Sequence, residues 1–170
     1  DLIDRSTLRN DIDVLEFNPP QGFGEGKAQI EDVSLCDPQG RQLPTIVGGE
    51  IVQLEITSVV QEDVENMIVG FYFKDRLGQL LFGDNTETAR QGVPLSLHGG
   101  ERFRAKFVFE MPRLQQGDYF ITAGIASGSQ QDHVIQHWMH EALALRSLGQ
   151  GLPVGIIGLP MHEIELEKVL

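Results

Sequence analysis

The stretch Asn66–Asp75, Asn-Met-Ile-Val-Gly-Phe-Tyr-Phe-Lys-Asp, decides the fold because its side chains alternate between two faces. Val69, Phe71 and Phe73 share one face, which is apolar throughout. The opposite face carries the residues at the intervening positions: Ile68, Gly70, Tyr72 and Lys74. A period of two is typical of a β-strand with one face in the core, so we expect a half-buried strand here.

Similar strand patterns lie on both sides of this stretch and recur every ten to twenty residues. They cover residues 27–36, 46–56, 80–83, 102–109, 119–126, 134–148 and 162–167. Asp37–Gly40 has Asp first, Pro second and Gly last, as a tight turn requires. A bulge is expected at Glu31-Asp32 and a loop over 84–98. Long helical periodicity is absent, so the sequence predicts an all-β, two-layer antiparallel sandwich of roughly seven to nine strands.

The two ends of the chain differ from its centre. Leu8, Ile12 and Leu15 have the spacing of one face of a short helix, and Pro19-Pro20 then breaks the pattern. We therefore interpret 1–25 as a linker or docking arm and 26–148 as the sandwich domain, with the Gly-rich 22–26 as a flexible entry into the first strand. Residues 149–170 are interpreted as an arm with an edge strand. That strand can pair with its own sheet or be exchanged with a second copy in a homodimer, and both outcomes stay open.

Charge and composition exclude several kinds of partner. The formal net charge of −12 and the pI of about 4.7 disfavour nucleic acid and anionic lipid. No apolar run reaches the roughly 20 residues that span a bilayer, so we expect no membrane insertion. The chain lacks an initiator Met and is expected to be a fragment of a longer protein. Cys36, the only cysteine, is interpreted as a half-buried strand residue.

Motifs for catalysis and cofactors are missing. The sequence has no P-loop, no dinucleotide fingerprint and no Gly-x-Ser-x-Gly elbow, and no pair of carboxylates stands out. His133, His137 and His140 would share one face of a helix and suggest zinc. On the expected strand only His133 and His137 share a face, so we expect no metal, no cofactor and no enzyme.

Residues suited to sugar recognition form two groups. Sugar rings have apolar faces and many hydroxyls, so their sites combine aromatic rings with polar side chains. The first group lies in and just after the alternating stretch: Tyr72, Lys74, Asp75, Arg76, Asp84, Asn85 and Thr86. The second surrounds the only tryptophan: Gln136, His137 and Trp138. Two alternatives stay open, namely that Trp138 caps the core and that Asp75-Arg76 is a hairpin turn with a local ion pair.

The first group belongs to a longer motif, Tyr72–Thr86, which reads Tyr-Phe-Lys-Asp-Arg-Leu-Gly-Gln-Leu-Leu-Phe-Gly-Asp-Asn-Thr. It resembles the central motif of the C-terminal carbohydrate-binding domain of Wzt-type proteins, the ATP-binding subunits of O-antigen polysaccharide ABC exporters. Supporting pieces follow the family's order between Gly26 and Leu145. They are 28–33, 37–40, 48–50, 117–119, and Trp138 ahead of 142–145.

This resemblance implies an immunoglobulin-like sandwich on the cytoplasmic face of a bacterial inner membrane. The implied role is to recognise O-polysaccharide for export, with the ATPase domain upstream and a membrane transporter subunit as its partner. Polymannose with a modified non-reducing end is the glycan we expect. The alternative is a protein-interaction or dimerisation sandwich without a glycan site.

Overall fold

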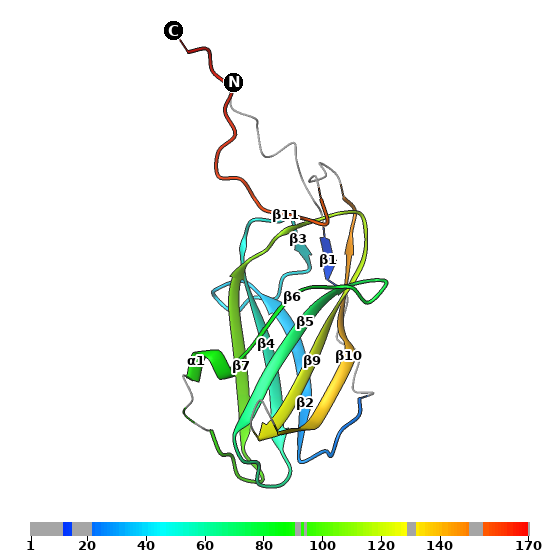
Figure 1. The fold of residues 1–170 in the computed structure, drawn as a ribbon, viewed down its shortest axis with the longest axis vertical. Helices are drawn as coiled ribbons and strands as arrows, with labels where there is room; N and C mark the ends of the chain where they lie inside the picture. Colours follow the sequence, from blue (N-terminus) through cyan, green and yellow to red (C-terminus); the bar gives the residue numbers. More distant parts are fainter. Residues whose placement is uncertain are drawn as a thin grey trace.

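The structure is a computed structural model that describes residues 12–14, 22–90, 93, 95–128, 132–149 and 155–169. It is a two-layer antiparallel sandwich (Figure 1). One layer has six strands in the order β3-β1-β10-β9-β5-β6, and the other has three in the order β2-β4-β7. The strand bounds are β1 (Ile12–Val14), β2 (Ala28–Cys36), β3 (Thr45–Ile46), β4 (Ile51–Val60), β5 (Met67–Asp75), β6 (Leu80–Asn85), β7 (Arg102–Glu110), β8 (Arg113–Leu114), β9 (Gly117–Gly128), β10 (His133–Ser147) and β11 (Ile157–Gly158).

The alternation in β5 is confirmed and builds the core. Val69, Phe71 and Phe73 are all buried, and Phe73 is fully so. Residues opposite them on β9 in the same layer, such as Ile121 and Ala123, are buried too. Fully burying one such large apolar side chain contributes about 1.5–3 kcal/mol, so the β5–β9 pair is a main source of stability. The predicted immunoglobulin-like sandwich is therefore confirmed, with β10, β9 and β5 facing β2, β4 and β7.

The expected turns and the expected bulge are present. The carbonyl of Asp37 accepts a hydrogen bond from Gly40 N at 2.9 Å, which closes the turn after β2. The β2–β4 register shifts between Ile30 and Asp32, where the bulge was expected. Cys36 is buried at the end of β2 rather than half-buried.

At Ile12 the N-terminal segment forms a strand rather than the expected short helix. Residues 12–14 form β1, which pairs with β10 and β3 and buries Ile12 completely. In the sheet the Ile12 side chain is fully buried, which is favourable. A single isolated helical turn would be unstable in water. Leu8 and Leu15, the other members of the pattern, lie outside the described residues. Residues 23–26 are also joined to β10 by backbone hydrogen bonds.

The segment after β5 also differs from expectation. Asp84 and Asn85 belong to β6 rather than to a loop, and the four-residue helix α1 (Glu87–Arg90) follows. No helix in the described part of the chain is long and apolar enough to cross a membrane.

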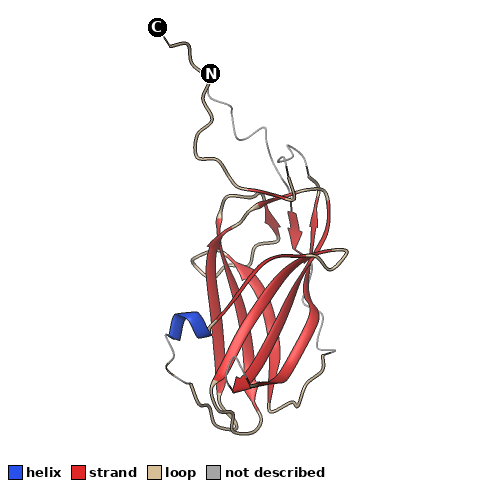
Figure 2. Cartoon of the chain, in the orientation of Figure 1, coloured by secondary structure: helices blue, strands red, loops and turns tan. Residues whose placement is uncertain are grey.

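The expected strand over 162–167 is not formed in the single chain. Residues 163–169 have no strand pairing and lead away from the sandwich (Figure 2). Leu166 is 95% exposed and Ile164 is 51% exposed. The short β11 pairs with β8, and the described residues beyond it, 159–169, belong to no strand. Pairing with a second copy is not tested by a single chain.

Candidate carbohydrate-binding groove

A groove crosses the outer face of the six-stranded layer, and its floor is made of backbone. One row of paired residues runs across four strands, from Asn85 on β6 through Gly70 and Gly124 to Trp138 on β10. The two central glycines carry no side chain, so no side chain rises from the sheet between Asn85 and Trp138. The resulting hollow has a volume of about 390 Å³. Hollows of this size suit small ligands or a few sugar units.

Two aromatic rings form one wall of this groove, and each rests on a glycine. A Cβ atom on Gly124 would lie 2.5 Å from Cε3 of Trp138, so the indole covers that glycine at a distance only glycine allows. A Cβ on Gly83 would lie 2.8 Å from Cδ1 of Tyr72. The Tyr72 and Trp138 rings meet edge to face, with centroids 5.6 Å apart. Glycines therefore fix the positions of both rings.

The other side of the groove combines apolar and polar side chains. Ile68, Ala126 and Ile135 supply the apolar part, and His133 lies beside them. Polar groups come from the end of β6 and the start of α1: Asp84, Asn85 and Glu87. The side chain of Asn85 accepts a hydrogen bond from Glu87 N at 2.9 Å, and Asp84 accepts one from Asn85 N at 2.8 Å. These bonds fix the Asn85 amide and the Asp84 carboxylate at the edge of an aromatic groove.

Five of the predicted residues lie in or beside this groove. Tyr72, Asp84, Asn85 and Trp138 line it. The Lys74 ammonium lies 5.5 Å from the centre of the Tyr72 ring, where a cation–π interaction holds it next to the groove. Trp138 is half-buried and Tyr72 is 40% exposed, so both rings retain an accessible surface.

Asp75 and Arg76 form the hairpin turn instead. The Asp75 carboxylate accepts hydrogen bonds from Leu77 N at 2.9 Å and from Gln79 N at 2.8 Å, and its carbonyl accepts one from Gly78 N. This side chain therefore shapes the β5–β6 turn, which was the structural alternative for it. Arg76 is exposed in the same turn.

Gln136 and His137 point into the molecule. A register shift between Ile135 and His137 turns both side chains away from the groove. His137 Nδ1 accepts a hydrogen bond from Ile30 N at 2.8 Å, and burial lowers its pKa. Gln136 accepts from Lys27 N and donates to Ser127 Oγ. These two residues therefore join β10 to β2, and we leave them out of the candidate site.

The same bulge determines which of the three histidines share a face of the sheet. His133 is exposed and lines the groove, whereas His137 is buried, so the expectation that they share a face is wrong. No three His, Cys, Asp or Glu side chains of the described residues come together in a way that could hold a metal ion.

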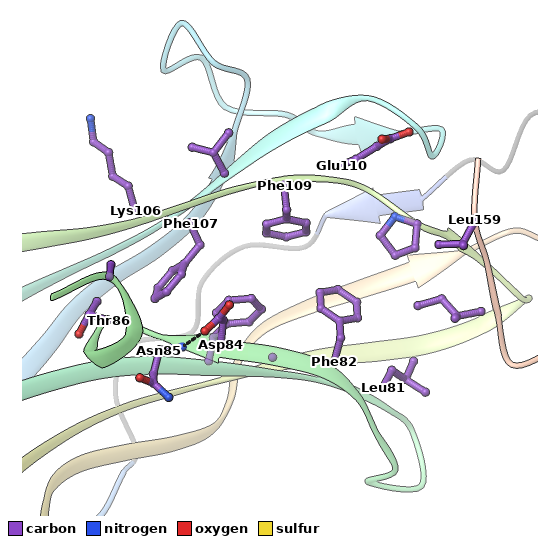
Figure 3. A pocket seen from close by; sticks show the side chains of 16 residues that line it. Leu81, Phe82, Asp84, Asn85, Thr86, Lys106, Phe107, Phe109, Glu110 and Leu159 are labelled. Carbon is purple, nitrogen blue, oxygen red and sulfur yellow. Dashed lines mark hydrogen bonds between the residues drawn. The ribbon is translucent and has the colours of Figure 1, made fainter. Parts of the chain in front are cut away.

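A second and larger hollow of about 690 Å³ opens between the edges of β6 and β7 (Figure 3). The phenyl rings of Phe71, Phe82, Phe107 and Phe109 line it and contact one another, with centroids 4.9 to 6.2 Å apart. Thr86 lies at this second hollow rather than at the groove, and its hydroxyl accepts a hydrogen bond from Val69 N. The hollow is thus the open side of the hydrophobic core. Its walls also carry the polar side chains of Asp84, Asn85, Thr86, Lys106 and Glu110, so Asp84 and Asn85 lie at both hollows (Figure 3).

The floor of the groove was missed by sequence reasoning. Gly70 was placed on the outer face, but nothing in the sequence shows that Gly124 lies opposite it and that Trp138 lies opposite Gly124. A glycine inside a strand is the available signal, because it often marks a close approach.

The fold and groove define an immunoglobulin-like β-sandwich domain with a groove on one outer face. A family model described as the Wzt C-terminal domain matches residues 20–159, and the chain belongs to this family. A solved structure described as "Crystal structure of the C-terminal domain of wzt" is similar, with a TM-score of 0.73. The two sequences are 22% identical, and the match covers 88% of this chain and 91% of that one. No curated protein matches this chain.

Proposed function

We propose that this domain binds O-antigen polysaccharide in the groove and presents it to an ABC exporter without catalysing a reaction. The observation that carries the proposal is the aromatic pair Tyr72–Trp138 beside a floor of two glycines. An exposed ring stacks on the C–H face of a sugar, and the missing side chains at Gly70 and Gly124 leave room for the rings and the sugar above the sheet. Asn85, Asp84 and Glu87 then supply acceptors and a donor for the hydroxyls.

The charges of the groove are divided between its ends, with carboxylates at Asp84 and Glu87 and the Lys74 ammonium beside Tyr72. Asp84 and Glu87 carry negative charge at one end, in a chain whose net charge is −12. Like charges repel at short range, so a uronic acid or a phosphate would be disfavoured beside them. Polymannose with a modified non-reducing end remains the proposed glycan, with the modification placed away from these carboxylates.

The cellular setting is part of the same proposal. Membership of the Wzt C-terminal domain family supports a partnership with an ATPase domain and a membrane transporter subunit. The domain would then work at the cytoplasmic face of the inner membrane, where it meets the finished glycan.

Fluorescence provides the direct test because Trp138 is the only tryptophan. The chain is titrated with O-polysaccharide isolated from the source strain, and with a polysaccharide of a different repeat. We expect saturable quenching or a spectral shift with the first only. Tyr72→Ala should lower the affinity about fivefold, since one ring contact contributes about 1 kcal/mol.

Leu77→Ala is the matched control, because Leu77 is an apolar side chain that is 84% exposed in the β5–β6 turn. It should leave the affinity unchanged. Absence of binding to the polysaccharide of the source strain would refute the proposed function. Equal losses of affinity in Tyr72→Ala and Leu77→Ala would show that the binding site is not the groove.

Dimerisation through the C-terminal tail is a second candidate role. Residues 163–169 are unpaired in the single chain, yet Ile164 and Leu166 are apolar and exposed. Such a segment can add a strand to a second copy. Deleting 161–170, which leaves Leu159 in place, should convert a dimer to a monomer in light scattering. A truncated chain that remains dimeric would show that the tail is not the interface, and a monomeric full chain would refute the dimer.

A further inference from the structure

The segment Gly22–Gly26 is joined to β10 like an additional short strand. Phe23 N donates to the Trp138 carbonyl at 3.2 Å, and Trp138 N donates to the Phe23 carbonyl at 2.8 Å. Glu25 N donates to the Ile135 carbonyl at 3.0 Å, and Gly26 N to the Gln136 carbonyl at 2.8 Å. The segment therefore shares its backbone hydrogen bonds with the strand that carries the groove tryptophan.

Glycines make this close approach possible. A Cβ on Gly24 would lie 2.3 Å from the Gln136 carbonyl oxygen, and its φ of +141° also favours glycine. A Cβ on Gly22 would lie 2.4 Å from Nε2 of His137. The Gly-rich composition, which suggested a flexible lead into the first strand, thus serves a defined backbone position. Phe23, between the two glycines, is held at that position.

Phe23 extends the aromatic wall of the groove. Its ring centroid is 5.9 Å from that of His140, which is 6.4 Å from Trp138, which in turn is 5.6 Å from Tyr72. Thr122 Oγ1 donates to the His140 carbonyl at 2.7 Å, and so holds β10 where its register shifts. The row of rings Tyr72, Trp138, His140 and Phe23 is named the aromatic row below.

The exposure of Phe23 has no structural explanation. Its side chain is 56% exposed although it is large and apolar, and it contributes little to the core. A single exposed phenylalanine is unremarkable, but one placed at the end of a row of rings is a ready contact surface. The spacing between neighbouring rings is of the order of the rise per sugar along a pyranose chain, so successive sugars can each meet a ring.

We propose that the aromatic row is an extended binding surface, in which Phe23 and His140 contact sugars beyond those that fill the groove. This inference rests on the proposed function and specifies its ligand as an internal or terminal stretch of several consecutive sugars. Since Phe23 belongs to the segment that leads from the upstream residues, a glycan lying across Trp138 and Phe23 also clamps that segment to β10.

Binding as a function of glycan length tests the proposal. The whole 170-residue chain is titrated with the O-polysaccharide of the source strain and with size-fractionated oligosaccharides prepared from it by partial hydrolysis. For the wild type we expect affinity to rise with length beyond the shortest fragment that binds. Phe23→Ala should lower the affinity for long fragments about fivefold and leave that for the shortest unchanged. Phe23→Leu, which keeps apolar bulk without a ring, should show most of the same loss, and His140→Ala should show a similar dependence on length.

Hydrogen exchange gives an independent readout of the clamp. Exchange at the amides of Phe23 and Glu25 should slow when the long oligosaccharide is bound, and should not slow with the shortest fragment. Leu77→Ala serves as the control for an exposed apolar side chain far from the row.

The outcomes separate the two proposals. If the wild type binds the polysaccharide but Phe23→Ala lowers the affinity for all lengths equally, or for none, the extended surface is refuted and the groove proposal stands. If the wild type binds no fraction, the proposed function fails and the extended surface fails with it.

Discussion

Replacing Gly124 by alanine would test the groove without removing any group that could contact a ligand. The added Cβ would lie 2.5 Å from Cε3 and 2.7 Å from Cζ3 of Trp138. Carbon atoms that are not bonded prefer separations of about 3.5–4.0 Å, so the indole must move outward by about 1 Å. The half-buried position of Trp138 allows that movement without unfolding the sheet.

The expected effect follows from the ring pair. The displaced indole loses part of its edge-to-face contact with Tyr72, whose centroid is 5.6 Å away, and no longer presents its face beside the glycine floor. An aromatic contact of this kind is worth about 0.5–1.5 kcal/mol, which corresponds to a roughly two- to tenfold lower affinity for O-polysaccharide. The free energy of unfolding should fall by about 1 kcal/mol, as for an ordinary substitution.

The assay is tryptophan fluorescence, because the single indole reports its own displacement. We expect the emission of the Gly124→Ala chain to shift to longer wavelength, as the ring becomes more hydrated, and its titration to show the weaker affinity. Gly99→Ala is the control, since its Cβ would lie 2.9 Å from the Gln61 carbonyl oxygen, far from the groove. It should cost stability and leave emission and affinity unchanged. Unchanged emission and affinity in Gly124→Ala would show that the indole does not rest on this glycine.

Three further substitutions test the fold and the assignments around the site. Phe73→Ala should lower the free energy of unfolding by about 3–5 kcal/mol in urea, because the ring is fully buried, and a loss below 1 kcal/mol would contradict its place in the core. Asp75→Ala should lower stability by about 0.5–2 kcal/mol through the lost turn hydrogen bonds and leave glycan affinity unchanged; a loss of affinity would return Asp75 to the site. Burial lowers the pKa of His137, so the unfolded chain binds the proton more readily and wild-type stability should fall as the pH drops below about 6.5. His137→Asn, which keeps an acceptor for Ile30 N, should lose that part of the pH dependence in urea unfolding, and identical pH profiles would contradict it.

The strand faces could be predicted from the sequence because they depend on a local rule. The alternation in β5 and β7 places each side chain in or out of the core, and the structure agrees for Phe71, Phe73 and Ala105. Turn chemistry was equally local, as the Asp37–Gly40 turn shows. The N-terminal segment failed for the opposite reason. Ile12 is in a strand because it pairs with β3 and β10, and both of these strands are distant in the sequence.

The site depended on two features that a local pattern does not contain. One is the bulge between Ile135 and His137, which reverses the facing of His137 relative to His133. The other is the pairing of Gly70 with Gly124, which creates the floor from residues that are 54 positions apart in the sequence. Tyr72 and Trp138 were identified by residue type alone. Their meeting across β9 required the sheet order.

The second hollow, between β6 and β7, has a practical consequence for handling the protein. Ile157 and Leu159 lie at this hollow, beside phenyl rings of the core. A chain that ended before Gly155 would leave those rings open to water next to two strand edges, and exposed apolar surface beside a free edge favours aggregation. Preparations of this domain should therefore retain residues up to Pro160, and loss of the segment by proteolysis should appear first as turbidity and dye binding, before any loss of secondary structure.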